Sequence, residues 1–236
     1  PWRGAPFVGV ALYVEALTSA RFLAALAHTL FFAFVTVSLE VLLGTATALV
    51  LARALRARGA LRSVVLLPWA VPTVVSALVW RLFFAWALPQ ISFFTDAHLA
   101  WIPVIVADVW KSTPFVTLIV LAGLTQIDPA LDEAARVDGA SSWQRFARIT
   151  LPLLRPSLAV AVVFRVLDAI RVFDVVFVLT GGGPGTATEP LSLLAYDAFM
   201  RDLRFGAGSA ISMLLFAIAL GLALVYVRIA GAREDA

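Results

Sequence analysis

The sequence predicts an all-α membrane protein with about five transmembrane helices. Hydrophobic residues make up 62% of its 236 residues and charged residues only 14%, whereas soluble domains lie nearer a half and a quarter. Such an excess of apolar side chains cannot all be buried inside a water-soluble domain of this size, so a lipid environment is expected. Helices are expected rather than strands, because a lone strand leaves its backbone groups unpaired in lipid and the alternation of a membrane barrel is missing.

Five stretches are long and apolar enough to cross a bilayer, for which a helix needs roughly 20 residues. They comprise residues 29–52, 63–88, 101–124, 151–180 and 207–227. Prolines interrupt three of them, namely Pro68, Pro72, Pro103, Pro114, Pro152 and Pro156. Kinks at prolines fit a transport pathway, although the ordinary curvature of membrane helices is an equal alternative.

The basic residues predict how these helices are oriented, because lysine and arginine accumulate in cytoplasmic connections. The connections after the first and third helices are rich in arginine, with Arg53, Arg56, Arg58, Arg62, Arg136, Arg145, Arg148 and Arg155. The connection at 89–100 has neither lysine nor arginine. We therefore place an N-terminal segment, 1–28, outside and a short tail, 231–236, in the cytoplasm, around a membrane domain at 29–230. An exported N-terminal segment without a signal peptide needs a preceding span, so we expect one more helix before Pro1 and six in the native chain.

The connection at 125–150 carries more ordered structure than a link between two helices needs. Asp128 is a good N-cap for a first short helix, and Gly139 can end that helix in a left-handed conformation. Ser141 is expected to begin a second helix, with Gln144 as its capping-box partner. The pattern predicts two short helices joined by a glycine turn.

This helix-turn-helix has the residues of a docking element. Ala134 and Ala135 are small enough to permit close approach by another surface, and Trp143 and Phe146 supply apolar anchors. The second helix is expected to end before Pro152. An amphipathic hairpin that lies on the bilayer surface, held there by arginines, is the alternative.

One motif in this loop resembles that of a known family. It consists of Glu133-Ala134-Ala135, Gly139, Ile149, Leu151 and Pro152 at matching spacing. With it, the chain resembles the permease subunits of binding-protein-dependent ABC importers. A longer pattern is similar to the carbohydrate-uptake branch, of the maltose/trehalose type, and comprises Val137-Asp138-Gly139-Ala140-Ser141, residues 164–174 and Leu179-Thr180-Gly181-Gly182-Gly183-Pro184.

The resemblance implies a permease domain at 29–230 that imports a sugar, such as the disaccharides trehalose or maltose, across a prokaryotic inner membrane. An external sugar-binding protein would deliver the cargo, a second permease would complete a heterodimer, and a dimeric ATPase docked on 128–156 would drive alternating access. The residues expected to couple to the ATPase are Glu133, Ala134, Ala135, Asp138 and Gly139. ATP and Mg²⁺ would bind to that partner, so no cofactor is expected in this chain.

Ionisable residues inside the predicted helices are costly in lipid and therefore mark candidate functional positions. Asp108, Lys111, Ser112 and Phe115 lie at i, i+3, i+4 and i+7, on one helical face. Such a face suits a sugar, whose hydroxyls take hydrogen bonds and whose C–H face stacks on an aromatic ring. We expect this face to line the substrate pathway, as the family's sugar contacts do on the equivalent helix. A packing role for an Asp108–Lys111 pair is the alternative.

The stretch at 151–180 adds Arg165, Asp168 and Arg171, which spread over about a third of the helix circumference. These residues could clamp sugar hydroxyls directly. The family often has small amides here, so gating or interhelical salt bridges are the alternative. Glu40, a lone acid in the first predicted helix, receives no role.

The composition also excludes several kinds of chemistry. The chain has no cysteine and only two histidines, far apart in sequence, so no metal site is expected. The sequence shows no recognisable Ser/His/Asp set or phosphate-binding loop, so no catalytic residue is expected. The basic residues indicate the orientation of the helices in the membrane rather than nucleic-acid binding. Two other functions stay open: an importer of amino acids, peptides or anions, which the charged helices favour, and a membrane scaffold or intramembrane enzyme.

Overall fold

The computed structural model describes residues 8–53 and 58–231, and within these ranges the chain forms helices and loops without a strand. The helices are α1 (Ala11–Thr18), α2 (Ala20–Arg53), α3 (Arg58–Ala70), α4 (Thr73–Ala87), α5 (Trp101–Leu124), α6 (Pro129–Val137), α7 (Ser142–Arg145), η1 (Phe146–Thr150, a π-helical turn), α8 (Leu151–Ile170), α9 (Asp174–Leu179), α10 (Leu191–Met200) and α11 (Phe205–Gly231). The prediction of an all-α fold is confirmed. Residues 1–7 of the predicted N-terminal segment, Arg56 and nearly all of the predicted tail lie outside the described residues.

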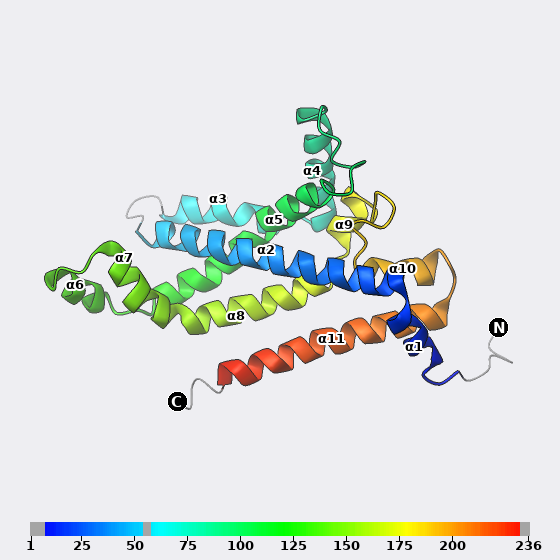
Figure 1. Ribbon diagram of the computed structural model, residues 1–236. Coiled ribbons are helices and arrows are strands. Elements are labelled where there is room, and N and C mark those ends of the chain that lie inside the picture. Colours follow the sequence, from blue (N-terminus) through cyan, green and yellow to red (C-terminus); the bar gives the residue numbers. More distant parts are fainter. Residues whose placement is uncertain (1–7, 54–57, 232–236) are drawn as a thin grey trace.

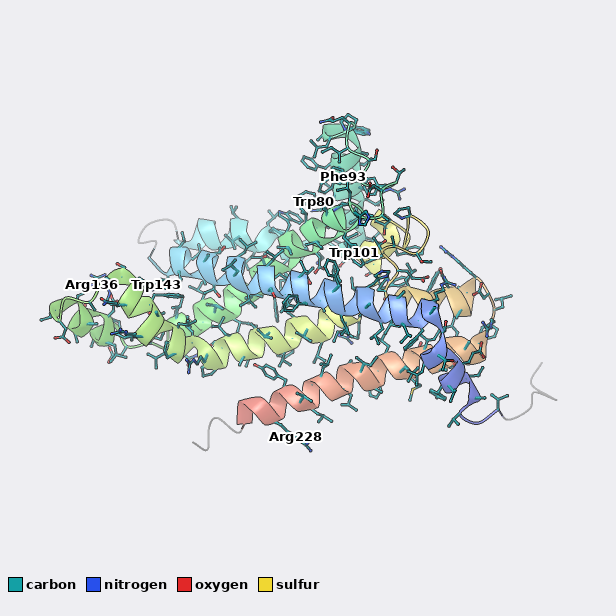
Figure 2. All side chains as sticks on the ribbon, in the orientation of Figure 1. Trp80, Phe93, Trp101, Arg136, Trp143 and Arg228 are labelled. Atoms are coloured by element: carbon teal, nitrogen blue, oxygen red, sulfur yellow. The ribbon has the colours of Figure 1, made fainter. Side chains whose placement is uncertain are left out.

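The long helices α2, α5, α8 and α11 lie roughly along one axis, α8 antiparallel to the other three, and form one bundle from which α4 projects (Figure 1). The α6–α7 hairpin lies at the same end of the molecule as the C-terminal end of α11, and α1, α9 and α10 lie at the opposite end (Figure 1). Figure 2 shows Arg136 and Trp143 at the first end and Trp101 toward the other. The parts predicted to share the cytoplasmic side thus lie together.

Several helices have the length and composition of membrane spans. Within the part of the chain that the structure describes, three segments qualify, Ala20–Ala52, Trp101–Leu124 and Phe205–Tyr226, and the bent pair Ser63–Ala70 and Thr73–Ala87 can supply a fourth. The span predicted at 101–124 coincides with α5. The helix α8 has 20 residues but carries Arg155, Arg165 and Asp168, so it is less apolar than the others.

Two helices predicted as continuous are broken instead. The stretch 63–88 divides into α3 and α4, which are bent by 98°. Pro72 causes this break, because it has no N–H for the helical ladder and disfavours a helical conformation at Val71. The stretch 151–180 ends as a helix at Ile170 and resumes at Asp174, although no proline or glycine lies between them.

The N-terminal segment is more helical than predicted. The sequence indicated a loop up to residue 28, but α1 occupies part of it and α2 begins at Ala20 rather than Thr29. Phe22 and Ala25 are buried against Leu191 and Ile211, which belong to α10 and α11. This tertiary packing extends the helix beyond the continuous apolar run.

The helix-turn-helix at 125–150 follows its local signals. Asp128 caps α6 by accepting a hydrogen bond from the N–H of Ala130 at 2.9 Å, and Gly139 ends the turn with φ of +75°. Ser141 and Gln144 form the predicted capping box. The predicted first helix, glycine turn and capping box are therefore confirmed.

The second helix of the loop does not end before Pro152, as was predicted. Instead α7, η1 and α8 form one continuous helix. The N–H of Leu151 bonds to the carbonyl of Phe146, five residues earlier. Because Pro152 cannot donate a backbone hydrogen bond, a π-helical turn just before it changes the bonding register and lets the helix continue.

Gly44 allows α2 and α5 to pack closely. A Cβ at this position would lie 2.8 Å from Cβ of Val116, and small residues are typical of such contacts between membrane helices. We expect Gly44→Ala to reduce the free energy of unfolding by about 1–3 kcal/mol, because the helices must move apart. The melting temperature of the purified protein in detergent measures this effect.

Gly221→Ala is the matched control for Gly44→Ala. Gly221 lies in α11, where an added Cβ would meet nothing within 4 Å. Alanine is the better helix former by about 1 kcal/mol, so this variant is expected to be neutral or slightly stabilised. Equal melting temperatures for the two variants would contradict the close packing of α2 on α5.

Candidate functional site

A cavity of about 500 Å³ lies between α5 and α8, beside the two helix breaks. Trp69 and Thr73, on either side of the first break, line it, as do residues of the second break from Arg171 to Phe173. Broken helices at membrane depth are tolerated where the freed backbone lines a cavity. The full lining is Trp69, Thr73, Asp108, Lys111, Ser112, Phe115, Phe164, Arg165, Leu167, Asp168, Ala169, Arg171, Val172, Phe173, Asp174 and Val175.

The structure brings all seven residues of the predicted substrate pathway to this cavity. Four come from one face of α5, namely Asp108, Lys111, Ser112 and Phe115, and three come from α8 and its C-terminal end, namely Arg165, Asp168 and Arg171. Their helical spacing explains why the members of each set lie together. That the two sets face each other follows from the packing of α5 on α8.

Arg165 is the centre of a buried ionic network. Its side chain is 5% exposed, and its Nε and Nη2 donate to the two carboxylate oxygens of Glu40 at 2.5 and 2.8 Å. Nη2 also donates to Asp108 at 3.1 Å, and Nη1 donates to Asp168 at 2.5 Å. The network therefore joins α2, α5 and α8, which confirms an interhelical salt bridge of the kind named as an alternative for these charges.

Two sequence interpretations change with this network. Glu40 was given no role, yet it is fully buried and pairs with Arg165. Asp108 was paired with Lys111 in one interpretation, whereas the ion pair that the structure describes joins Asp108 to Arg165. Arg171 takes no part in the network, and its Nε donates to the carbonyl of Leu167 at 3.1 Å.

Three aromatic rings, those of Trp69, Phe115 and Phe164, line the same cavity and form an aromatic wall. The ring of Phe115 lies 6.3 Å from that of Trp69 and 6.1 Å from that of Phe164, measured between centroids. The sequence interpretation missed Trp69 and Phe164. Phe164 could have been found, because it precedes Asp168 by four residues and shares its helical face. No local signal marks Trp69, which lies near the end of α3, just before the chain bends.

The α6–α7 hairpin forms a second candidate surface. Arg145 closes it with a salt bridge to Asp132 at 2.7 Å and a hydrogen bond to the carbonyl of Ala140 at 3.0 Å. Val137 and Trp143 are 88% and 72% exposed on it. The predicted coupling residues lie on this hairpin, and Glu133, Ala134, Asp138 and Gly139 are exposed while Ala135 is partly exposed. Exposed apolar groups on a rigid unit are typical of a protein-binding surface.

The fold and the cavity define a class of protein, a helical permease of the membrane. The chain has several apolar spans, and a polar cavity lies between α5 and α8, at the points where two helices break. Among residues 8–53 and 58–231, no group of three His, Cys, Asp or Glu side chains has the geometry of a metal site.

Comparison with known proteins identifies the family. Residues 40–230 match the family described as the binding-protein-dependent transport system inner membrane component, and the chain belongs to this family. It is therefore a multi-pass protein of the inner membrane. It is 46% identical to the trehalose/maltose transport system permease protein MalF of Thermococcus litoralis, over 98% of this chain and 82% of that one.

Further relatives agree with this assignment. The chain is 39% identical to the trehalose transport system permease protein SugA of Mycobacterium tuberculosis, over 96% of this chain and 76% of the relative. Its fold is similar to a chain in a crystal structure of a bacterial ABC transporter involved in the import of the acidic polysaccharide alginate. The TM-score is 0.83 at 25% identity, with 96% of this chain and 84% of that chain covered.

Proposed function

We propose that this chain is the permease subunit of an ATP-driven importer that carries a sugar, a disaccharide such as trehalose or maltose. The observation that carries the proposal is the cavity, which is lined both by an ionic wall, consisting of Asp108, Lys111, Arg165, Asp168 and Arg171, and by the aromatic wall. Relatives whose names specify trehalose and maltose transport support the same substrate class.

The chemistry of the two walls fits a sugar. Carboxylates accept hydrogen bonds from hydroxyls and guanidinium groups donate to them, and Asp168 and Arg171 offer one group of each kind. Aromatic rings bind the apolar C–H face of a sugar ring by contact area and stacking. Phe115 belongs to the aromatic wall and follows Lys111 by four residues and Ser112 by three, so it shares their face of α5.

Phe115→Ala is expected to weaken sugar binding about tenfold, which corresponds to about 1.4 kcal/mol, because the ring loses its contact with the sugar. Phe115→Tyr keeps the ring and serves as the matched variant, with an affinity close to that of the parent protein. The sugar concentration that gives half-maximal thermal stabilisation of the purified transporter measures the affinity. An unchanged affinity in Phe115→Ala would place the sugar elsewhere.

The α6–α7 hairpin would couple ATP hydrolysis in the ATPase to alternating access in this chain. In the proposed assembly, Glu133, Ala134, Ala135, Asp138 and Gly139 contact a dimeric ATPase, which binds ATP and Mg²⁺. A second permease completes the membrane part, and an external sugar-binding protein delivers the cargo. The exposed, internally braced hairpin and a structural neighbour whose complex contains an alginate-bound periplasmic protein support this assembly.

ATP hydrolysis by the assembled transporter tests the proposed cargo. With the binding protein present, trehalose or maltose is expected to stimulate hydrolysis, whereas amino acids and peptides are not. The competing function, an importer of amino acids or peptides, is favoured by the number of charged residues at the cavity. Stimulation by such charged solutes and by no sugar would overturn the proposal in favour of that alternative.

A further inference from the structure

Glu40 stands behind the ionic wall of the cavity. It belongs to α2, its side chain has no exposed surface, and it does not line the cavity. Both of its oxygens accept hydrogen bonds from Arg165, at 2.5 and 2.8 Å. Glu40 therefore cannot touch a cargo in the cavity, although it touches a residue that can.

The bidentate pair fixes the orientation of Arg165. A guanidinium group is planar and rigid, so holding its Nε and Nη2 edge also determines where Nη1 lies. Nη1 donates to Oδ2 of Asp168 and Nη2 to Oδ2 of Asp108. These contacts leave Oδ1 of each carboxylate outside the bonds that Arg165 makes.

The two carboxylates held by Arg165 are the acids of the cavity wall. The side chain of Asp168 is 66% exposed and that of Asp108 is 13% exposed, and both line the cavity. Asp168 thus has one oxygen bonded to the guanidinium and one with which a sugar hydroxyl could bond, whereas Asp108 is mostly buried and contributes less surface to the wall. The positions of both carboxylates depend on the orientation of Arg165, and through it on Glu40.

We propose that Glu40 is a positioning residue for sugar recognition, acting through Arg165 on the carboxylates of Asp108 and Asp168. This inference rests on the sugar-transport function proposed above. Stability alone is a poor explanation for the pair, because apolar residues of similar volume often replace buried ion pairs without loss. A misplacement of about 1 Å in a binding group, by contrast, can reduce activity by up to about a hundredfold.

A double replacement separates positioning from stability. Glu40→Leu combined with Arg165→Met removes the buried bidentate pair and leaves Asp108, which lines the cavity, without its cation, so the double variant is expected to lose less stability than Arg165→Leu, which leaves Glu40 buried and unpaired as well. The sugar concentration for half-maximal thermal stabilisation is nevertheless expected to rise on the order of tenfold, because the two carboxylates lose their support. Glu40→Gln keeps the shape and one good acceptor, so its rise is expected to be smaller, about threefold.

Thr36→Val is the matched control. Thr36 is buried one turn before Glu40 on α2, and its hydroxyl donates to the carbonyl of Phe32, away from the ionic network. This variant is expected to keep the parental half-maximal sugar concentration.

The outcomes distinguish this inference from the proposed function. A double variant with parental sugar affinity would overturn the positioning role, while the parent protein's response to sugar would still support transport. If the double variant did not assemble, an unchanged affinity in Glu40→Gln would overturn the positioning role instead. A parent protein that no sugar stabilises would overturn the sugar site, and the positioning role with it.

Discussion

Arg165→Leu is expected to lose about 3–5 kcal/mol of folding free energy, because it leaves a buried acid without its partner. Glu40 is fully buried and accepts both of its strong hydrogen bonds from this arginine, and the side chain of Asp108 is only 13% exposed. A loss of this size is a large part of the total stability of a protein, which is usually about 5–15 kcal/mol. The yield of folded protein in detergent and its melting temperature measure the effect.

Arg171→Leu is the control for this prediction. Arg171 also lines the cavity, but it is exposed and bonds only to the carbonyl of Leu167 among the contacts that the structure describes. Its replacement is expected to change the melting temperature little. If the two leucine variants were equally stable, Arg165 would not be the centre of a buried network.

Glu133→Ala is expected to reduce ATP-driven uptake at least about thirtyfold, because truncating a central contact of an interface costs about 2 kcal/mol or more. Glu133 is exposed on α6, whereas its neighbour Asp132 holds the hairpin together through Arg136 and Arg145. Removing Glu133 should therefore leave the hairpin folded and weaken only the docking of the ATPase. Uptake by the reconstituted transporter and co-purification of the ATPase measure the two effects.

Glu15→Ala is the matched carboxylate truncation at the other end of the molecule. Glu15 forms an exposed salt bridge with Arg204 at 2.6 Å, and such surface pairs contribute little to stability. This variant is expected to keep both uptake and ATPase association. Parental uptake and ATPase association in Glu133→Ala would show that the hairpin is not the docking element.

Features encoded in neighbouring residues could be predicted from the sequence. The span at 101–124 was placed correctly because its apolar stretch is long enough to cross a bilayer and contains only two charged residues, Asp108 and Lys111. The hairpin followed from Asp128, Gly139, Ser141 and Gln144, each of which acts on backbone groups within a few residues. The cavity face of α5 followed from helical spacing alone.

Features that depend on tertiary packing could not be predicted. Glu40 and Arg165 are 125 residues apart in sequence, and a lone acid in an apolar helix does not reveal its partner. No proline or glycine lies between α8 and α9, so the sequence does not indicate the break there. The early start of α2 depends on the burial of Phe22 against α10 and α11.

Uptake of labelled trehalose and maltose by proteoliposomes tests the central claim most directly. The liposomes would contain this chain with its partner permease and ATPase, with ATP on the ATPase side and the sugar-binding protein on the other. The account predicts that one or both disaccharides accumulate only when ATP and the binding protein are present. Accumulation of labelled amino acids or peptides without that of any sugar would contradict it.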